Sequence, residues 1–304
     1  MVNSWYVDKE SPRRWIQHLV KKWILKKKTA FQTVDLIDTY NFGLMILLDN
    51  KIQSTEADEF IYHESLVHPA LLAHPQPRKV LLLGGGEGAA LREVLRHPTI
   101  EKAVMVDIDE EFISISRDHL QSWHQGAFKN SRAKLVFEDA LGFIMKEEEK
   151  FDVILADLSD PIKGGPSVPL YTREFYEYAA GRLADSGLLV TQATEVFCGR
   201  EDIHTVINHT MASVFPHVAT YCEYIPSFGS MWGFAVASHH TTVKDMDAGL
   251  LKNKIKEREL TGLRYYDAIT HQRLFHLPLW LRKSITEQKK VSTMKTPVYS
   301  FSNE

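Results

Sequence analysis

From about residue 66 to residue 191, short apolar runs alternate with stretches of helical periodicity. The runs KVLLL, KAVMVDI, AKLVF, FDVILAD and GLLVTQ are separated by ALREVLRH, EEFISISRDHL, ALGFIMKEE and EFYEYAAGRLA. Near-continuous apolar strands between amphipathic helices are typical of a parallel sheet that is buried on both faces. The sequence therefore predicts an α/β fold with a doubly wound, Rossmann-like sheet, and a ligand outside the carboxyl ends of its strands.

The flanking segments have a different pattern. FQTVDLIDT and GLMILL, followed by the turn signal DNK, predict a small β-meander near residues 30 to 54, and a helix and two late strands are expected after residue 191. We expect an N-terminal β-strand domain over residues 1–65, a catalytic domain over 66–285, and a mobile polar tail over 286–304. The basic segment 13–28 has two interpretations, an amphipathic membrane-surface contact or the commoner solvated edge.

Composition excludes several classes of protein. A net charge of −3 and an isoelectric point near 6.5 argue against a nucleic-acid partner. No run reaches the ~18 apolar residues of a membrane span, and no signal-peptide pattern opens the chain, so we expect a cytoplasmic protein without a membrane partner. Neither the two cysteines, Cys198 and Cys222, nor the histidines have metal-ligand spacing, and no metal is expected.

The stretch VLLLGGGEGAA, residues 80–90, combines a glycine turn with an acid. Backbone N–H groups of such a turn, here with Gly84 and Gly86, commonly approach a pyrophosphate. Glu87 would repel that anion, but it would attract a nucleoside that carries a positive charge. Derivatives of S-adenosylmethionine are such nucleosides, because their sulfonium is cationic.

Four candidate strands end in an acid or are followed by one: Glu87, Asp107, Asp139 and Asp157. In a parallel sheet these positions share one rim. Asp107 follows the glycines at the distance from which an acid binds ribose hydroxyls, and Asp139 is then available for the adenine amino group. Each acid alone could merely cap the following helix. The four together favour a ligand site.

The segment ADLSDPIKGGPSVPLYTREFY resembles the D-x-S-D-P segment and following loop of the spermidine synthase family, the polyamine aminopropyltransferases. Other matching pieces are LLDNKIQSTEADEFIYHESLVHPALLAHPQPRKVLLLGGGEG, LREVLRHPTIEKAVMVDID, YIPSFGSMWGF and LRYYDAITHQRLFHLP. These pieces span residues ~30 to ~285 in the order of the family, so their combination is far more specific than any one of them.

The resemblance implies a small N-terminal β-domain followed by a methyltransferase-type α/β domain, assembled as a homodimer or homotetramer through the N-terminal part. It implies decarboxylated S-adenosylmethionine as co-substrate, no prosthetic group and a polyamine as acceptor. Asp157 is the implied proton acceptor, with Tyr62 beside it as the second catalytic residue. The implied adenosyl site comprises Gln32, Gln53, Gly84, Gly86, Glu87, Asp107, Ile108, Asp139, Ala140, Asp157 and Pro166. The implied amine site comprises Tyr62, His63, Glu87, Asp157, Asp160, Gln192, Phe228 and Trp232.

This chemistry needs a base and a charge filter. An alkyl ammonium has a pKa of about 10 and must lose a proton before it attacks the carbon next to the sulfonium, which Asp157 can accept. Glu87 would attract the free ammonium of the decarboxylated donor and repel the carboxylate of intact S-adenosylmethionine. Asp160 is expected to anchor the distal ammonium, and IKGGPSVP to act as a lid.

The acceptor and the reaction class retain alternatives. Family members that use putrescine commonly have Asp in the glycine turn and Tyr in an IPTY segment. Here Glu87, Phe228 in IPSF, and Trp232 are nearer to thermospermine and spermine synthases, which favours spermidine over putrescine or agmatine. The rival classes are an S-adenosylmethionine-dependent methyltransferase and a non-catalytic polyamine-binding protein. Leu82, where methyltransferases usually have an acid, argues against the first, and retention of Asp157 and Tyr62 argues against the second.

Overall fold

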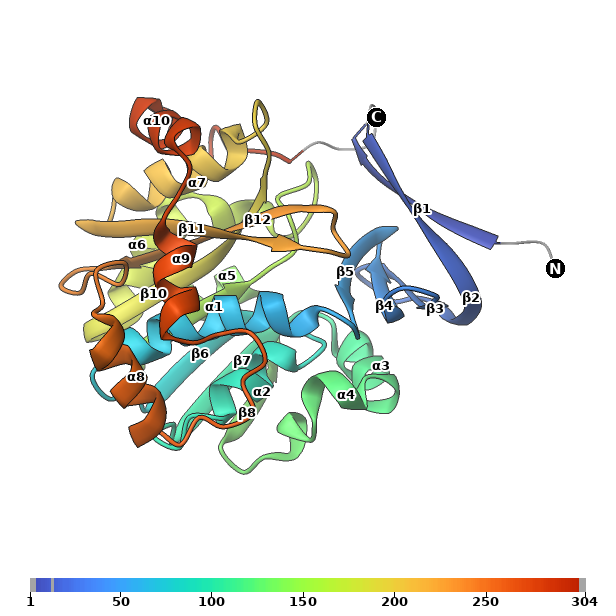
Figure 1. Cartoon of the computed structure of the whole chain (residues 1–304), viewed down its shortest axis with the longest axis horizontal. Helices are drawn as coiled ribbons and strands as arrows, with labels where there is room; N and C mark the ends of the chain where they lie inside the picture. The colour runs from blue at the N-terminus through green and yellow to red at the C-terminus, as the bar shows by residue number, and fades with distance from the viewer. Residues whose placement is uncertain (1–3, 12–13, 301–304) are drawn as a thin grey trace.

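The computed structural model describes residues 4–11 and 14–300, which form an N-terminal sheet followed by a larger sheet covered by helices (Figure 1). The strands of the N-terminal sheet are β1 (Ser4–Ser11), β2 (Arg14–Lys28), β3 (Thr33–Thr39), β4 (Gly43–Leu48) and β5 (Lys51–Thr55). The strands of the larger sheet are β6 (Lys79–Gly84), β7 (Lys102–Asp107), β8 (Ala133–Phe137), β9 (Phe151–Asp157), β10 (Leu183–Val196), β11 (His217–Ile225) and β12 (Ser230–Ser238). The helices are α1 (Glu59–Ala73), α2 (Ala89–Leu95), α3 (Glu110–His119), α4 (Gln121–His124), η1 (Ala127–Lys129), α5 (Ala140–Lys146), η2 (Val168–Tyr171), α6 (Arg173–Arg182), α7 (Asp202–Ala212), α8 (Ala248–Glu257), α9 (Ala268–Phe275) and α10 (Leu279–Glu287).

The larger sheet has the strand order β11-β12-β10-β9-β6-β7-β8. The strands from β10 to β8 run parallel, whereas β12 pairs antiparallel with both β10 and β11. This is the predicted doubly wound α/β sheet, extended at one edge by the predicted pair of late strands.

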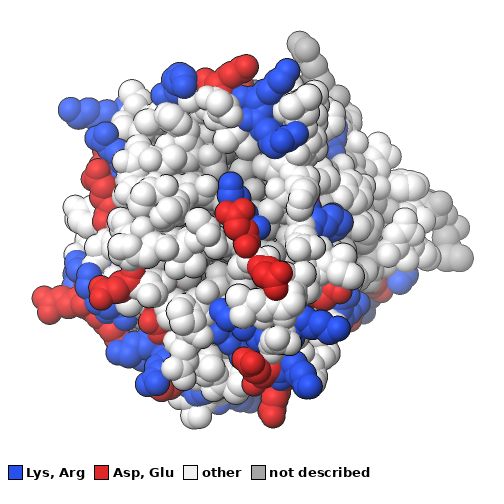
Figure 2. Space-filling view, turned by 60° about the vertical axis from the view of Figure 1, so that its left-hand side comes forward, with Lys and Arg blue, Asp and Glu red and all other residues white. Residues whose placement is uncertain are grey.

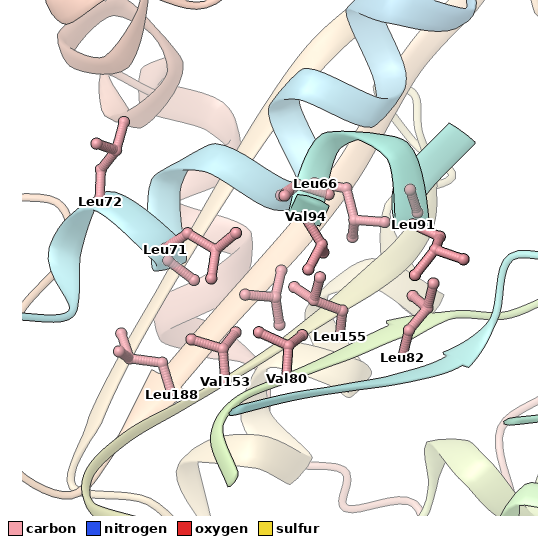
Figure 3. Close-up of a cluster of buried hydrophobic side chains, with 14 of the residues drawn as sticks. Leu66, Leu71, Leu72, Val80, Leu82, Leu91, Val94, Val153, Leu155 and Leu188 are labelled. Carbon is pink, nitrogen blue, oxygen red and sulfur yellow. The ribbon is translucent and has the colours of Figure 1, made fainter. Parts of the chain in front are cut away.

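The apolar runs of the strands are buried because helices cover both faces of the sheet. Along β6, Val80 and Leu82 pack with α1, α2, α8 and α9, whereas Leu81 and Leu83 pack with α5, α6 and α7. Figure 3 shows the first of these layers, in which Leu66 and Leu71 of α1 and Val94 of α2 lie on one side and Val80 and Val153 of the sheet on the other. Because both faces of the sheet are shielded from solvent, apolar and polar residues do not alternate along these strands.

The N-terminal sheet is a meander in the order β1-β2-β3-β4-β5. Strands β3 to β5 are the predicted meander. The basic segment was not expected to be a strand, but residues 14–28 form β2, which pairs antiparallel with β1 and β3. Neither of the two interpretations offered for the segment included this hairpin. Its side chains are exposed on both faces over much of its length, so no buried stripe reveals the strand in the sequence.

The larger domain begins earlier than expected from the sequence. Strand β5 ends at Thr55 and α1 begins at Glu59, so the expected boundary at residue 65 lies inside α1. A buried hydrogen bond connects the N-terminal sheet to the larger domain: the indole Nε1 of Trp123 in α4 donates to the hydroxyl of Ser54 in β5 (2.8 Å).

The C-terminal segment is packed against the larger domain, whereas its polar sequence was interpreted as a mobile tail. Ser292 is buried, its N–H donates to Thr210 Oγ1 (2.9 Å), and its carbonyl accepts from the N–H of Arg173 (2.9 Å). Val298 packs into the core on the α5–α7 face. Ser300 bridges in parallel with Ile162 and donates to the carbonyl of Pro161 (2.9 Å). Buried polar contacts therefore hold the tail as far as Ser300; residues 301–304 lie outside the described range.

Charges of both signs are interspersed over the face in Figure 2, without a continuous basic field. Among the helices within residues 4–11 and 14–300, none combines the length and the apolar character that crossing a bilayer requires.

Candidate active site

The strand ends bring most of the predicted residues to one rim. Gly84, the last residue of β6, is in register with Asp157, the last residue of β9. On the other side of β6, strand β7 ends at Asp107, which is in register with Phe137 of β8. Parallel strands end at the same edge of a sheet, and this is why the spacing along the sequence predicted their proximity.

The glycine turn lies against Asp157 because its residues have no side chains. Gly84 and Gly85 have φ of +80° and +77°, a conformation that favours glycine. A Cβ on Gly84 would lie 2.1 Å from the carbonyl oxygen of Asp157, and one on Gly85 would lie 3.2 Å from its Oδ2. The N–H of Gly85 donates to the Asp157 carbonyl (3.1 Å). A larger residue at Gly84 would force β6 and β9 apart.

Only one of the two oxygens of the Asp157 carboxylate accepts a hydrogen bond from the described residues. Tyr62 of α1 donates a hydrogen bond of 2.8 Å to Oδ1, while the buried Oδ2 has no hydrogen-bond partner among the described residues. Burial raises the pKa of Asp157, and the negative charge of Glu87 raises it further, to about 7, although His63 and Tyr62 act in the opposite direction. A carboxylate with a pKa near neutral and a free oxygen is suited to accept a proton.

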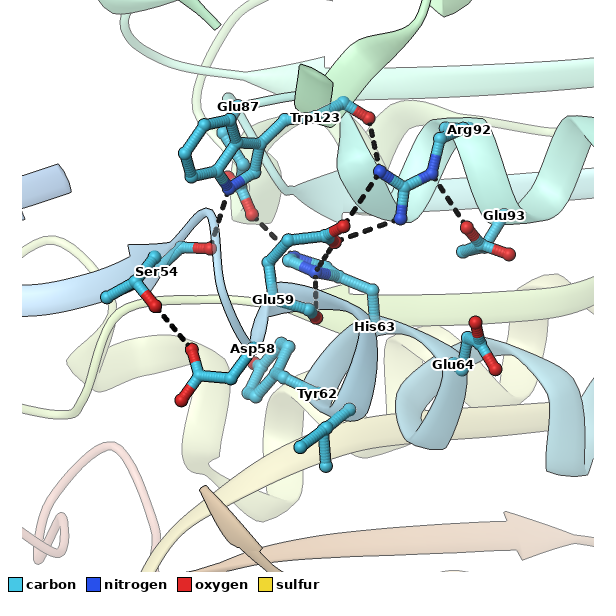
Figure 4. Close-up of polar contacts among 12 residues, drawn as sticks. Ser54, Asp58, Glu59, Tyr62, His63, Glu64, Glu87, Arg92, Glu93 and Trp123 are labelled. Atoms are coloured by element: carbon cyan, nitrogen blue, oxygen red, sulfur yellow. Dashed lines mark hydrogen bonds and ion pairs between the residues drawn. The ribbon is translucent and has the colours of Figure 1, made fainter. Parts of the chain in front are cut away.

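His63 lies between two carboxylates. Its Nε2 is 2.7 Å from Glu87 Oε1, and its Nδ1 is 3.0 Å from Glu59 Oε2 (Figure 4). Burial alone would lower the pKa of His63, but the hydrogen bonds to the two glutamates raise it to about 10. A ring nitrogen of His63, an oxygen of Glu87 and an oxygen of Asp157 all lie within 4.8 Å of one another. The two carboxylates can contact one cation, whereas the protonated ring is itself a cation beside them.

The expected adenosyl side lies around β7 and β8. Burial raises the pKa of Asp107 to about 7, and its Oδ1 accepts from the N–H of Asp109 (2.9 Å). Gln32 reaches this place from the N-terminal sheet, and its amide donates to Asp109 Oδ2 (3.0 Å). Ile108 lies between the two aspartates. Gln32, Asp107 and Ile108 thus lie together.

Asp139 has the capping role that was the alternative interpretation of the rim acids. It is the N-cap of α5, directly before Ala140, and its Oδ2 accepts from the N–H of Gly142 (2.7 Å). Two other predicted residues make no hydrogen bond to the acids of the rim in the described part of the chain. Gln53 on β5 donates only to the Lys51 carbonyl (3.5 Å), and Pro166 is exposed on the loop after β9; among the described residues, neither bonds to a rim acid.

The expected acceptor side is organised by Gln192 of β10. Its Nε2 donates to the Leu158 carbonyl (2.8 Å) and to Asp160 Oδ1 (3.3 Å), and its Oε1 accepts from Trp232 Nε1 (3.2 Å). The register of β10 and β12 shifts after Gln192, where Thr194 has a φ of +61°, unusual for a β-branched residue. Gln192, which bonds to Asp160, is thus the last residue of β10 before the irregularity.

Aromatic side chains complete this side. The rings of Phe228 and Trp232 pack edge to face with centroids 4.9 Å apart, and Phe228 lies 6.4 Å from the Tyr62 ring. Burial raises the pKa of Asp160 to about 6. The side therefore offers a carboxylate and an apolar wall, which suits the ammonium and methylene groups of an alkyl amine.

Sequence reasoning missed three polar residues around this site. Glu59 and Arg92 form a buried ion pair (2.9 Å) behind His63. Tyr171 of η2 is buried, and its hydroxyl donates to the Ser159 carbonyl (3.2 Å). The spacing of Glu59 and His63, four residues apart on a predicted helix, was the only signal for any of them.

Comparisons with known proteins agree with this geometry. Residues 59–247 match the family model described as the spermine/spermidine synthase domain, and residues 4–56 match the spermidine synthase tetramerisation domain. The polyamine aminopropyltransferases of Sulfolobus acidocaldarius and Sulfurisphaera tokodaii are 41% and 44% identical, in each case over 97% of both chains.

Solved structures show the same fold. A spermidine synthase in complex with the transition-state analogue AdoDATO superposes with a TM-score of 0.88 at 28% identity, covering 95% of this chain and 97% of that chain. The spermidine synthase from Thermotoga maritima gives a TM-score of 0.86 at 28% identity, with 95% and 96% covered. The resemblance inferred from the sequence is confirmed, and neither a methyltransferase nor a non-catalytic binding protein is favoured. The chain therefore belongs to the spermidine synthase family of polyamine aminopropyltransferases, which are enzymes that transfer aminopropyl groups.

Proposed function

We propose that this chain transfers the aminopropyl group of decarboxylated S-adenosylmethionine to spermidine, with Asp157 as the proton acceptor, and releases methylthioadenosine. Decarboxylated S-adenosylmethionine is the aminopropyl donor of the family, and spermidine is the finer part of the proposal. The observation that carries the assignment of Asp157 is that its buried Oδ2 has no hydrogen-bond partner in residues 4–11 and 14–300, while its Oδ1 accepts from Tyr62.

The proposed reaction is an in-line displacement. Asp157 takes a proton from the acceptor ammonium and becomes a carboxylic acid, and the free amine attacks the aminopropyl carbon beside the sulfonium. The new C–N bond forms while the C–S bond breaks, and its electron pair passes to sulfur, which leaves as the neutral thioether of methylthioadenosine. Alignment of amine and carbon within the site lowers the barrier further.

The cluster of His63, Glu87 and Asp157 supports the assignment of the donor side. In this proposal the carboxylates of Glu87 and Asp157 face an ammonium of the substrates, and His63 holds Glu87 in place through its Nε2. Glu87 faces the donor amine and disfavours intact S-adenosylmethionine, whose carboxylate it would repel. Asp107 binds the ribose hydroxyls, and its neighbours Gln32 and Ile108, with Gln53, Asp139, Ala140 and Pro166, surround the nucleoside.

The acceptor side supports a long polyamine. Phe228 lies beside Tyr62 where a tyrosine would offer a hydroxyl to an ammonium, so the far charge must bind elsewhere. Asp160, held by Gln192, is the group we assign to it. Phe228 and Trp232 would contact the methylenes between the two charges. These features favour spermidine, and a tetraamine product, over putrescine or agmatine.

The N-terminal sheet is the part we assign to assembly into a dimer or tetramer. It matches a tetramerisation model, and it exposes large aromatic side chains: Trp5, Trp15, Trp23, Phe31 and Tyr40. Burial of such side chains by a second copy would be favourable. We place the enzyme in the cytoplasm, since Cys198 and Cys222 are both free.

A turnover assay tests the proposal. The enzyme is incubated with decarboxylated or intact S-adenosylmethionine and, separately, with spermidine, putrescine or agmatine, and the products are separated by chromatography. We expect methylthioadenosine and a tetraamine with the decarboxylated donor and spermidine. A preference for putrescine would refute the long acceptor alone, whereas adenosylhomocysteine, or no product, would refute the proposed reaction.

A further inference from the structure

The hydrogen-bond partners of His63 fix its protonation state by geometry. Nδ1 faces the Glu59 carbonyl oxygen at 2.7 Å and Glu59 Oε2 at 3.0 Å, and Nε2 faces Glu87 Oε1 at 2.7 Å. All of these atoms are acceptors when the carboxylates are ionised. A neutral imidazole has a single N–H donor and would leave one ring nitrogen opposite an acceptor, so this arrangement needs the doubly protonated ring.

Glu59 is itself held from behind by Arg92. The guanidinium donates through Nη1 to Oε1 (3.1 Å) and through Nη2 to Oε2 (2.9 Å), a forked pair that fixes the plane of the carboxylate. Both side chains are buried, with 7% and 6% exposure. Oε2 therefore serves the histidine and the arginine at once, and its position fixes that of the ring.

Arg92 is fixed in turn by groups that have no part in the proposed chemistry. Its Nη1 also donates to the Trp123 carbonyl (2.6 Å), and its Nε donates to Glu93 (2.7 Å). Glu93 is buried and also accepts from Arg96 Nε (3.1 Å), and its charged partners outweigh burial and lower its pKa to about 2. Charges thus alternate in sign from Glu87 through His63, Glu59 and Arg92 to Glu93, and helices α1 and α2 carry most of them (Figure 4).

We infer that Glu59 is a positioning residue: with Arg92 bound to its carboxylate, Glu59 holds a cationic His63 between itself and Glu87, next to the carboxylate of Asp157. The inference rests on the proposed function for its catalytic consequence. Glu59 touches neither of the reacting atoms, and it acts through the histidine.

The physical reason is the proximity of like charges. Glu87 raises the pKa of Asp157, and His63 lowers it. The groups that face His63 are Glu59 from its own helix, Glu87 from the glycine turn, Asp157 from β9, and the Tyr62 ring with its centroid 5.1 Å away. Without a carboxylate at position 59, the ring would lose its proton more readily, and the Asp157 carboxyl would hold its own proton more tightly.

The first test follows His63 directly by NMR in histidine-labelled protein, with the signals assigned by their loss in His63→Asn. In the parent we expect the ring to stay protonated through neutral pH. In Glu59→Gln, which keeps the shape but removes the charge, we expect the titration of His63 to move down by about three pH units or more, into the range of the Asp157 titration, because burial then acts against a single carboxylate partner. An unchanged titration would overturn the inference. This readout does not need activity, so it stands even if the parent enzyme releases no methylthioadenosine, a result that would refute the proposed function instead.

The second test is the pH profile of kcat/KM for methylthioadenosine release. Glu59→Gln should move the acid limb to higher pH by about one unit, because Asp157 loses a cationic neighbour. A lower rate with an unmoved limb would mean that Glu59 is only structural. Arg92→Lys keeps the positive charge but loses the two parallel hydrogen bonds to Glu59. It should move the acid limb in the same direction by a smaller amount, and it replaces Glu59→Gln as the test if that variant does not fold. If the limb of Arg92→Lys stays where the parent has it, the inference fails.

Glu56→Gln is the matched control, since Glu56 is an exposed carboxylate three residues before Glu59 and outside the network. Its NMR titration and its pH profile should coincide with those of the parent. Shifts in Glu56→Gln equal to those in Glu59→Gln would show that loss of any nearby charge is sufficient, and would overturn a role through the contact.

Discussion

Tyr62 and Asp157, which are 95 residues apart in the sequence, are joined by a hydrogen bond of 2.8 Å that leaves the second carboxylate oxygen buried and without a partner among the described residues. The tyrosine fixes the orientation of the carboxylate, and the orphaned oxygen is the place where a substrate proton can be accepted. An unpaired buried carboxylate oxygen is unfavourable in a protein that needs it only for stability, and this supports the proposal that the pair takes part in catalysis.

Asp157→Asn should lower kcat roughly 100- to 10,000-fold, because an amide cannot take the proton of the acceptor ammonium. The variant should still bind methylthioadenosine in calorimetry, since Asn fills the same space. Asp185→Asn, at an exposed position in the sequence before the run of buried residues in β10, is the control and should have the parent rate. If the rate of Asp157→Asn lay within tenfold of the parent rate, another group would have to accept the proton of the acceptor ammonium.

The free enzyme should lose activity as the pH falls below neutral. Asp157 accepts a proton only when it is ionised, and burial together with the Glu87 charge raises its pKa to about 7. The acid limb of kcat/KM should therefore lie near pH 7, and that of kcat lower, because the bound cationic donor stabilises the carboxylate. Measuring kcat and kcat/KM from about pH 5 to about pH 9 checks the positions of the two acid limbs. A limb near the ordinary pKa of aspartate would contradict it.

Glu87→Gln should weaken binding of the decarboxylated donor and narrow its preference over intact S-adenosylmethionine by about tenfold or more. The glutamine keeps a hydrogen-bonding group next to His63 but neither attracts the donor ammonium nor repels a carboxylate. Competition between the two donors measures the ratio, and Glu101→Gln, whose side chain is 61% exposed, is the control. An unchanged ratio would mean that discrimination lies elsewhere in the pocket.

Phe228→Tyr should raise kcat/KM for putrescine relative to spermidine by about tenfold, the value of one hydrogen bond to a charged group. The new hydroxyl would lie near Tyr62 and could accept from the ammonium of a short acceptor. Tyr224→Phe changes one hydroxyl at an exposed position of β11 and should leave the ratio unaltered. If the ratio in Phe228→Tyr also stays constant, position 228 does not select the acceptor.

The parts of the site that the sequence predicted are those set by one strand ending beside another. Gly84 and Asp157 could be placed together because both follow apolar runs of a parallel sheet, whose carboxyl ends share a rim. The Glu59–Arg92 pair was not predicted, since it depends on how α1 packs against α2, and no periodicity specifies which side chains meet there.

The structures of two segments were misjudged for the same reason. In β2, Trp15 and Trp23 are exposed among lysines, and the missing apolar alternation concealed a strand that hydrogen bonds to both neighbours define. In the C-terminal segment, the buried Ser292 is polar, so the sequence there resembles a solvated tail although its backbone is paired with Thr210 and Arg173. Hydropathy patterns report burial of side chains, and both segments are held mainly through the backbone.

The pairing of Ser300 with Ile162 has a consequence for biosynthesis. When a ribosome has translated β10, every acid of the rim has been made, and the parallel strands β6 to β9 have their partners within the nascent chain. The loop after Asp157 does not, because the residue that bridges to it is added only after α10. The catalytic rim can therefore take shape during translation, whereas the loop beside it acquires its last neighbour only once synthesis has passed Ser300.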